Sequence, residues 1–171
     1  MSAQKGLFAE FLNPIFIETG SYYGDGIQQA LDEGFKTIYS IELSPELYQE
    51  CKKRFCDNFN VHLILGDSQY VLADILKNID RKVTFWLDGH HCGGNSATGE
   101  QRFPLIFELD AIKGHYIKEH TIIIDDLRCF SVPGEGFDAE VLKRIIKKIN
   151  KDYIFCFRDG FVPNDILVAT I

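Results

Sequence analysis

Short apolar runs alternate along the chain with segments whose apolar residues recur at the three- and four-residue spacing of an amphipathic helix. The runs predict strands at 15–17, 37–43, 60–65, 83–87 and 121–124, and the amphipathic segments predict helices at 26–33, 45–56, 71–79, 104–116 and 139–150. This regular alternation predicts an α/β fold with a parallel sheet, right-handed crossovers and helices on both faces.

The two ends of the chain depart from the alternation. Residues 153–157 and 166–171 predict two strands, and the loop between them contains Gly160 and Pro163, which indicates an antiparallel hairpin. Residues 1–13 are too few for a domain and predict one apolar helical turn that covers the edge of the sheet. We therefore expect a single domain that spans residues 1–171.

The first predicted strand leads into a glycine-rich turn. Glu18 follows the apolar run, and Gly20, Gly24 and Gly26 come before the first helix. Glycine suits a turn that needs positive φ, and it lets a ligand approach the bare backbone. A tight turn that binds nothing is the alternative. The spacing differs from the Gly-x-Gly-x-x-Gly of dinucleotide-binding proteins, which disfavours a nicotinamide oxidoreductase.

Acidic residues follow every predicted parallel strand. They are Glu18, Glu42, Asp67, Asp88, Asp125 and Asp126. Ligands of open α/β sheets bind at the carboxyl ends of the strands, so these acids predict one acidic, ligand-binding rim. An acid in the position of Glu42 can accept hydrogen bonds from ribose hydroxyls, and Asp67 can accept one from an adenine amino group. For each of these two, capping of the following helix is the alternative.

The pattern acid-x-Gly-x-x-x-Gly-x-Gly at 18–26 resembles motif I of the class I S-adenosylmethionine-dependent methyltransferases, and the likeness extends over 14–171. It implies a doubly wound sheet of seven strands in the order 3-2-1-4-5-7-6, with strand 7 antiparallel and helices on both faces. It also implies S-adenosylmethionine as the cofactor. The expected cofactor-binding residues are Glu18, Gly20, Tyr22, Gly24, Gly26, Glu42, Leu43, Asp67, Ser68 and Asp88.

Three of the rim acids predict a metal site. Asp88 and the pair Asp125–Asp126 end neighbouring strands in this order, so their carboxylates should converge. Carboxylates this close repel one another unless a cation joins them, and oxygen ligands favour Mg²⁺ or another divalent cation. The arrangement resembles the metal site of the catechol-type and macrocin-type O-methyltransferases. The alternative is that Asp88 binds only the ammonium group of the cofactor and Asp126 caps a turn.

Two histidines follow the fourth strand. His90 lies two residues after Asp88, where the macrocin-type enzymes that this segment resembles have an aspartate proposed as the general base. The usual imidazole pKa of about 6.5 suits proton abstraction near neutral pH, and His91 competes for the role. We therefore expect His90, His91 and Asp88 to be the catalytic residues.

Composition narrows the range of partners. The net charge of −7 disfavours a nucleic acid, which requires a positive surface. No apolar run approaches the roughly 20 residues of a membrane span, so we expect no membrane partner. The odd number of five cysteines, without a Cys-x-x-Cys pair, indicates reduced thiols in a cytoplasmic protein.

Together these features predict an S-adenosylmethionine-dependent methyltransferase (EC 2.1.1) with magnesium-assisted O-methylation of a small hydroxylated acceptor, such as a sugar, a nucleotide sugar or a glycan. Metal-independent N-methylation of an amino sugar and a cofactor-binding module without catalysis are the alternatives. The N-terminal segment is too short to cover an acceptor. The lid must therefore come from 89–103, from 128–137 or from a second subunit, and a homodimer is one arrangement that the sequence allows.

Overall fold

The computed structural model of the protein describes residues 4–89, 104–130 and 138–171. Its strands are β1 (Ile15–Thr19), β2 (Ile38–Glu42), β3 (Val61–Leu65), β4 (Val83–Leu87), β5 (Thr121–Ile124), β6 (Ile154–Arg158) and β7 (Ile166–Thr170). Its helices are the 3₁₀ turn η1 (Phe8–Phe11), α1 (Asp25–Asp32), α2 (Pro45–Arg54), α3 (Ser68–Leu76), α4 (Leu105–Gly114), α5 (Leu127–Phe130) and α6 (Ala139–Lys147).

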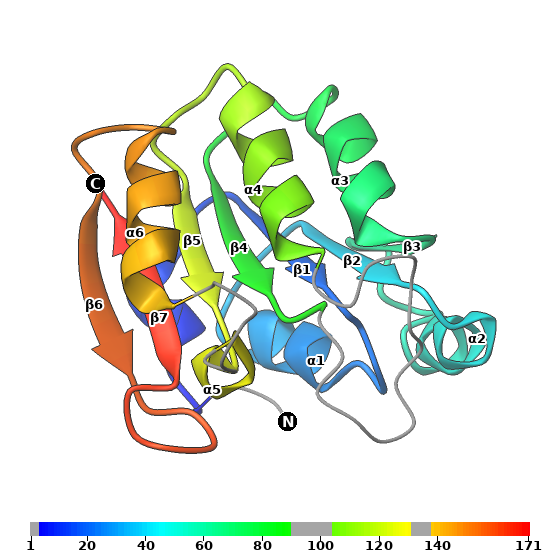
Figure 1. Ribbon diagram of the computed structural model, residues 1–171. Coiled ribbons are helices and arrows are strands. Elements are labelled where there is room, and N and C mark those ends of the chain that lie inside the picture. Colours follow the sequence, from blue (N-terminus) through cyan, green and yellow to red (C-terminus); the bar gives the residue numbers. More distant parts are fainter. Residues whose placement is uncertain (1–3, 90–103, 131–137) are drawn as a thin grey trace.

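The seven strands form one sheet in the order β3-β2-β1-β4-β5-β7-β6, which confirms the predicted topology (Figure 1). The strands from β3 to β5 pair in parallel, and β7 pairs antiparallel with both β5 and β6. The carboxyl ends of β1, β4 and β5 are level, because Thr19 pairs with Leu87 and Leu87 pairs with Ile124. The order in which successive strands are added to the sheet reverses between β1 and β4, and such a switch point is where open α/β sheets bind ligands.

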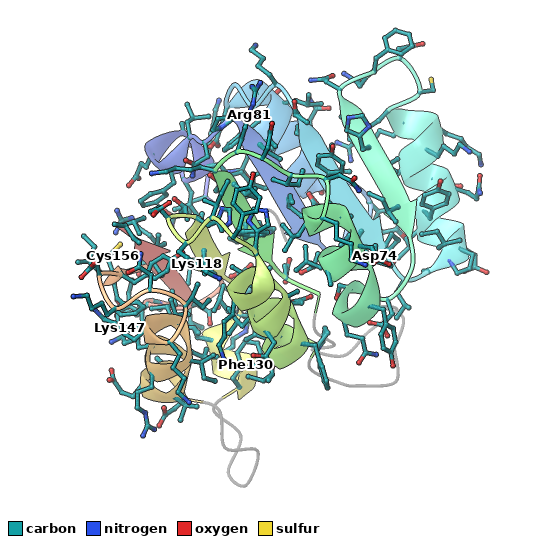
Figure 2. The ribbon with its side chains drawn as sticks, turned by 90° about the horizontal axis from the view of Figure 1, so that it is seen from above. Asp74, Arg81, Lys118, Phe130, Lys147 and Cys156 are labelled. Carbon is teal, nitrogen blue, oxygen red and sulfur yellow. The ribbon has the colours of Figure 1, made fainter. Side chains whose placement is uncertain are left out.

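Each face of the sheet carries its own apolar core. Helices lie on either side of the strands (Figure 2). On β1, Ile15 and Ile17 pack toward α3, α4 and α6, whereas Phe16 packs toward η1, α1 and α2. Phe130 of α5, labelled in Figure 2, belongs to the first of these cores. This alternation fixes which side of the sheet Glu18 and Thr19 face, because successive strand residues point to opposite faces.

Three details correct the sequence-based expectations. Helix α3 begins at Ser68 rather than at residue 71, because the Asp67 side chain caps it by accepting a hydrogen bond from Gln69 N. The short helix α5 lies in a segment predicted as a loop. The turn η1 covers the middle of the sheet rather than its edge. Phe8 packs on rings of β1 and β4, with centroids 4.8 Å from Phe16 and 5.1 Å from Trp86.

The thiols agree only partly with the expectation of reduced cysteines. Cys51, Cys56 and Cys156 are free, but Cys129 is disulfide-bonded, so the expectation is wrong at that residue. Among the described helices, none has both the length and the apolar character that crossing a membrane would require.

Candidate functional site

The glycine-rich turn joins β1 to α1 and touches the end of β4. Gly20 and Gly24 have φ values of +87° and +84°, in the left-handed region that favours glycine. A Cβ atom on Gly20 would lie 2.8 Å from the carbonyl oxygen of Asp88. Packing within the protein therefore explains this glycine, and the turn alone is not evidence of a ligand.

Glu18 provides more direct evidence. It is only 1% exposed, and its Oε2 has no hydrogen-bond partner within the described residues. The carboxylate lies against the first turn of α1, where a Cβ atom on Gly26 would be 3.0 Å from Oε2. Burial and then the charge of Asp88 raise the pKa of Glu18 well above its usual value, although a hydrogen bond from Ser40 opposes the shift. A buried polar atom without a partner is costly, so a ligand that supplies a donor or a positive charge would stabilise this site.

Glu42 lies at the end of β2 and binds the turn beside it. Its Oε2 accepts a hydrogen bond from Tyr22 N and its Oε1 accepts one from Ser44 N, both at 2.8 Å. Glu42 therefore supports the start of α2 through the backbone of Ser44, although the cap itself is the Ser44 hydroxyl, which accepts from Leu47 N. Each carboxylate oxygen has a further lone pair, so these contacts position Glu42 without using its full accepting capacity. The Tyr22 side chain is 46% exposed, and Leu43 next to Glu42 is half-buried.

In the turn after β3, Asp67 and Ser68 make different contacts. Asp67 is the N-cap of α3 and accepts hydrogen bonds from Gln69 N and from Gln69 Nε2. The Ser68 side chain is buried, and its hydroxyl donates to Glu108 Oε1 at 2.6 Å. Asp67 therefore has the capping role that we gave as the alternative to adenine binding, while Ser68 supports the turn from inside the protein.

The structure brings Asp88 and Asp125 to adjacent strand ends. Asp125 N donates to the Leu87 carbonyl at 3.2 Å, directly before Asp88 in the chain. Burial and then the neighbouring charges of Asp125 and Asp126 raise the pKa of Asp88 well above its usual value. Burial and then the charge of Asp126 raise the pKa of Asp125 to about 7. These two predicted metal ligands therefore lie at adjacent strand ends, where burial and mutual repulsion favour their protonated forms.

Two residues that sequence reasoning missed complete this cluster. Asp125, Asp126 and Asp165 each offer a carboxylate oxygen within 4.8 Å of the others, and Asp88 is not part of that trio. Arg128 donates from Nη1 to both Asp126 Oδ1 and Asp165 Oδ2, and its backbone N donates to Asp165 Oδ1 at 3.0 Å. A protein cation therefore already neutralises part of the trio.

A topological signal could have identified Asp165. It immediately precedes β7, and an antiparallel strand begins at the edge of the sheet where its parallel neighbours end. The start of β7 therefore belongs to the same rim as the carboxyl end of β5. Arg128 carries no such signal, because its contact depends on the short helix α5, which was predicted as a loop.

The predicted metal ligands have suitable chemistry, but their arrangement differs from the predicted set in two respects. Asp88 lies outside the close trio that Asp165 completes, and Asp126 is already bound by Arg128. Asp88, Asp125 and Asp126 supply only carboxylate oxygens, which suit a hard divalent cation. With Asp165 they make four acids near the single guanidinium of Arg128, and burial and then repulsion between the acids raise the pKa values of Asp88 and Asp125. Asp126, however, would have to share its carboxylate between Arg128 and a metal.

The predicted bases His90 and His91 lie outside the described residues. Their role as general base remains a prediction from the sequence.

No protein-family model and no curated protein sequence matches the chain. Solved structures do match. A protein of Streptococcus mutans, provisionally assigned as a methyltransferase and solved with SAH, is 12% identical, with 100% of both chains covered and a TM-score of 0.65. The SAH-bound Podospora anserina methyltransferase PaMTH1 is 14% identical, with 92% of this chain and 71% of that chain covered and a TM-score of 0.62. An rRNA methylase from Streptococcus thermophilus is 15% identical, with 97% and 92% covered and a TM-score of 0.61.

At these identities the likeness shows the fold, which is that of the class I methyltransferases. One of these neighbours carries the name of an rRNA methylase, so the fold does not select an acceptor.

Proposed function

We propose that the protein is an S-adenosylmethionine-dependent methyltransferase that O-methylates a small hydroxylated molecule, such as a sugar, with the help of Mg²⁺ or another divalent cation. The observation that carries the proposal is the group of buried, uncompensated acids at the carboxyl edge of the sheet. Within the part of the chain that the structure describes, Glu18 Oε2 has no hydrogen-bond partner, and burial raises the pKa values of Glu18, Asp88 and Asp125.

The β1–β2 half of the rim suits the cofactor. S-adenosylmethionine carries a sulfonium and an ammonium group, and the buried carboxylate of Glu18, whose Oε2 has no partner among the described residues, would stabilise positive charge beside the glycine turn. Glu42 is held by two backbone N–H groups at the end of β2, where a ribose would lie beside the turn. We assign the adenine to Leu43 and to the turn of Asp67 and Ser68.

The β4–β5 half of the rim suits the acceptor. A divalent cation bound by Asp88, Asp125 and Asp126 would lower the pKa of an acceptor hydroxyl and would favour acceptors with two neighbouring oxygens. His90 or His91 would then remove the hydroxyl proton. The net charge of −7 favours a small molecule over a nucleic acid as the acceptor.

The chemical step would be an in-line displacement. The acceptor oxygen forms a bond to the methyl carbon while the bond from that carbon to sulfur breaks, and the hydroxyl proton passes to the base. The protein contributes mainly by holding the two reactants in line, which is worth on the order of 7 kcal/mol or more at best.

Calorimetry and a turnover assay on two variants test both halves of this proposal. Asp125→Asn should leave the affinity for SAH within about twofold and abolish methyl transfer to a panel of sugars, nucleotide sugars and catechols, because it removes an ionic metal ligand. Asp110→Asn, on the exposed side of α4, is the matched control and should change neither. Absence of SAH binding by the wild type would refute the cofactor assignment, and full activity of Asp125→Asn would refute the metal assignment.

One observation favours a second candidate, the metal-independent N-methyltransferase. Arg128 already supplies a positive charge to Asp126 and Asp165, so those acids have a partner without a metal. In that case Asp88 and Asp125 would bind the cofactor ammonium or an amino group of the acceptor. Activity on an amino sugar that survives a chelator would support this candidate, and activity lost with chelator and restored by Mg²⁺ would exclude it.

A further inference from the structure

A second buried acid lies beneath the proposed cofactor site, on the other face of the sheet. Glu108 of α4 is 1% exposed and belongs to a helix face that is otherwise apolar, with Leu105, Leu109 and Ile112 also buried. An ionisable group in such a face is costly unless it has a specific partner. Nothing in the apolar packing of α4 accounts for it.

Glu108 is hydrogen-bonded to one turn of the rim and lies close to two further strand ends. Its Oε1 accepts a hydrogen bond from the Ser68 hydroxyl at 2.6 Å, in the turn after β3. A Cβ atom on Gly89, directly after Asp88, would lie 3.2 Å from Glu108 Oε1 and 3.1 Å from Thr19 Oγ1. The ends of β1, β3 and β4 therefore meet around one carboxylate.

These turns are the ones assigned above to the cofactor. Thr19 immediately precedes Gly20, and Gly20 in turn packs against the carbonyl of Asp88. Ser68 follows the capping residue Asp67 and is the first residue of α3. A displacement of the Glu108 side chain would therefore reach both the adenine end and the methionine end of the proposed site.

We propose that Glu108 is a positioning residue for cofactor binding, which holds the turns after β1, β3 and β4 in their relative places from beneath. The inference rests on the proposed function, since it concerns the same site. Glu108 does not touch the cofactor. It acts through the Ser68 hydroxyl and through the space that it leaves for the backbone of Gly89.

Calorimetry with SAH tests this on the full-length chain. Glu108→Ala leaves the buried Ser68 hydroxyl without its acceptor and should raise the Kd for SAH about tenfold, since an unsatisfied buried donor costs roughly 1–3 kcal/mol. Ser68→Ala should raise the Kd in the same direction. The double variant should be no weaker than the worse single variant, because both remove one interaction. Glu108→Gln keeps an acceptor oxygen and should restore the Kd to within about threefold of the wild type.

Leu109→Ala is the matched control, because it truncates the next residue of the same buried helix face without touching the rim. It should lower the melting temperature but leave the Kd within about twofold. If Glu108→Ala binds SAH as tightly as the wild type, or if Leu109→Ala weakens binding equally, the positioning role is wrong while the proposed function stands. If the wild type itself does not bind SAH, the proposed function fails and this inference fails with it.

Discussion

The pH dependence of stability in the variant Glu108→Gln can be predicted and tested without a ligand. Burial raises the pKa of Glu108 from 4.5 to about 7, against the opposing effect of the hydrogen bond from Ser68. The folded protein therefore prefers the protonated acid, whereas the unfolded chain ionises at its ordinary pKa. Glutamine has nearly the same shape, stays neutral at every pH and can still accept the hydrogen bond from Ser68.

The pKa of Glu108 in the folded and the unfolded protein determines the sign and the size of the expected pH dependence of stability. A group whose pKa is raised on folding stabilises the protein fully below its unfolded pKa, here about 4.5, and that contribution is lost as the pH rises through about 7. The difference between the two pKa values of Glu108 corresponds to about 3 kcal/mol of unfolding free energy, and most of it is lost between about pH 5 and pH 8. The variant lacks this loss. Its stability relative to the wild type should therefore increase by about 2–3 kcal/mol from pH 5 to pH 8.

Urea unfolding at a series of pH values measures this difference, with the fluorescence of Trp86 as the probe. Trp86 is the single tryptophan and is 2% exposed in β4, so unfolding changes its environment. The other acids with raised pKa values titrate in both proteins and cancel in the difference. Glu119→Gln, at an exposed position, is the control and should show no trend with pH. A difference between Glu108→Gln and the wild type that does not change with pH would refute the reasoning.

Three further predictions concern other buried polar groups. Glu18→Gln replaces a buried carboxylate whose Oε2 has no partner among the described residues, so it should raise the melting temperature and weaken SAH binding at least about tenfold; unchanged affinity in calorimetry would contradict its cofactor role. Asp165→Ala leaves Arg128 without one of its two carboxylates and should lower the unfolding free energy by about 3 kcal/mol in urea, whereas a loss near zero would show that Asp126 alone suffices. Burial and then the charge of His115 lower the pKa of His120 from 6.5 to about 4, so its contribution is present above about pH 6.5 and about 3 kcal/mol is lost as the pH falls through 4. In His120→Gln the unfolding free energy should fall less steeply at acid pH. An unchanged fall would show that other groups cause the acid sensitivity.

The sequence was sufficient for the fold because its evidence is local and repeated. Apolar runs of strand length followed by amphipathic segments predicted the parallel part of the sheet, and a turn with Gly160 and Pro163 predicted the closing hairpin. The expected strand order, which came from the resemblance to the methyltransferases, is the order found. The placement of η1 was wrong, because periodicity shows that Phe8 is buried but not which strands it packs against.

Some residues of the site could be predicted from the sequence, and others could not. Those at the carboxyl ends of parallel strands, such as Glu18, Glu42 and Asp88, follow from sequence position alone, because strand direction brings all such ends to one edge. Glu108 and Arg128 do not, because each reaches the rim through the packing of a helix. Contacts between residues 40 positions apart, such as Ser68 with Glu108, exist only once α3 and α4 pack against the sheet. The sequence by itself determined which edge of the sheet is acidic; only the tertiary structure decided which of those acids are paired, since pairing depends on distances that local sequence does not encode.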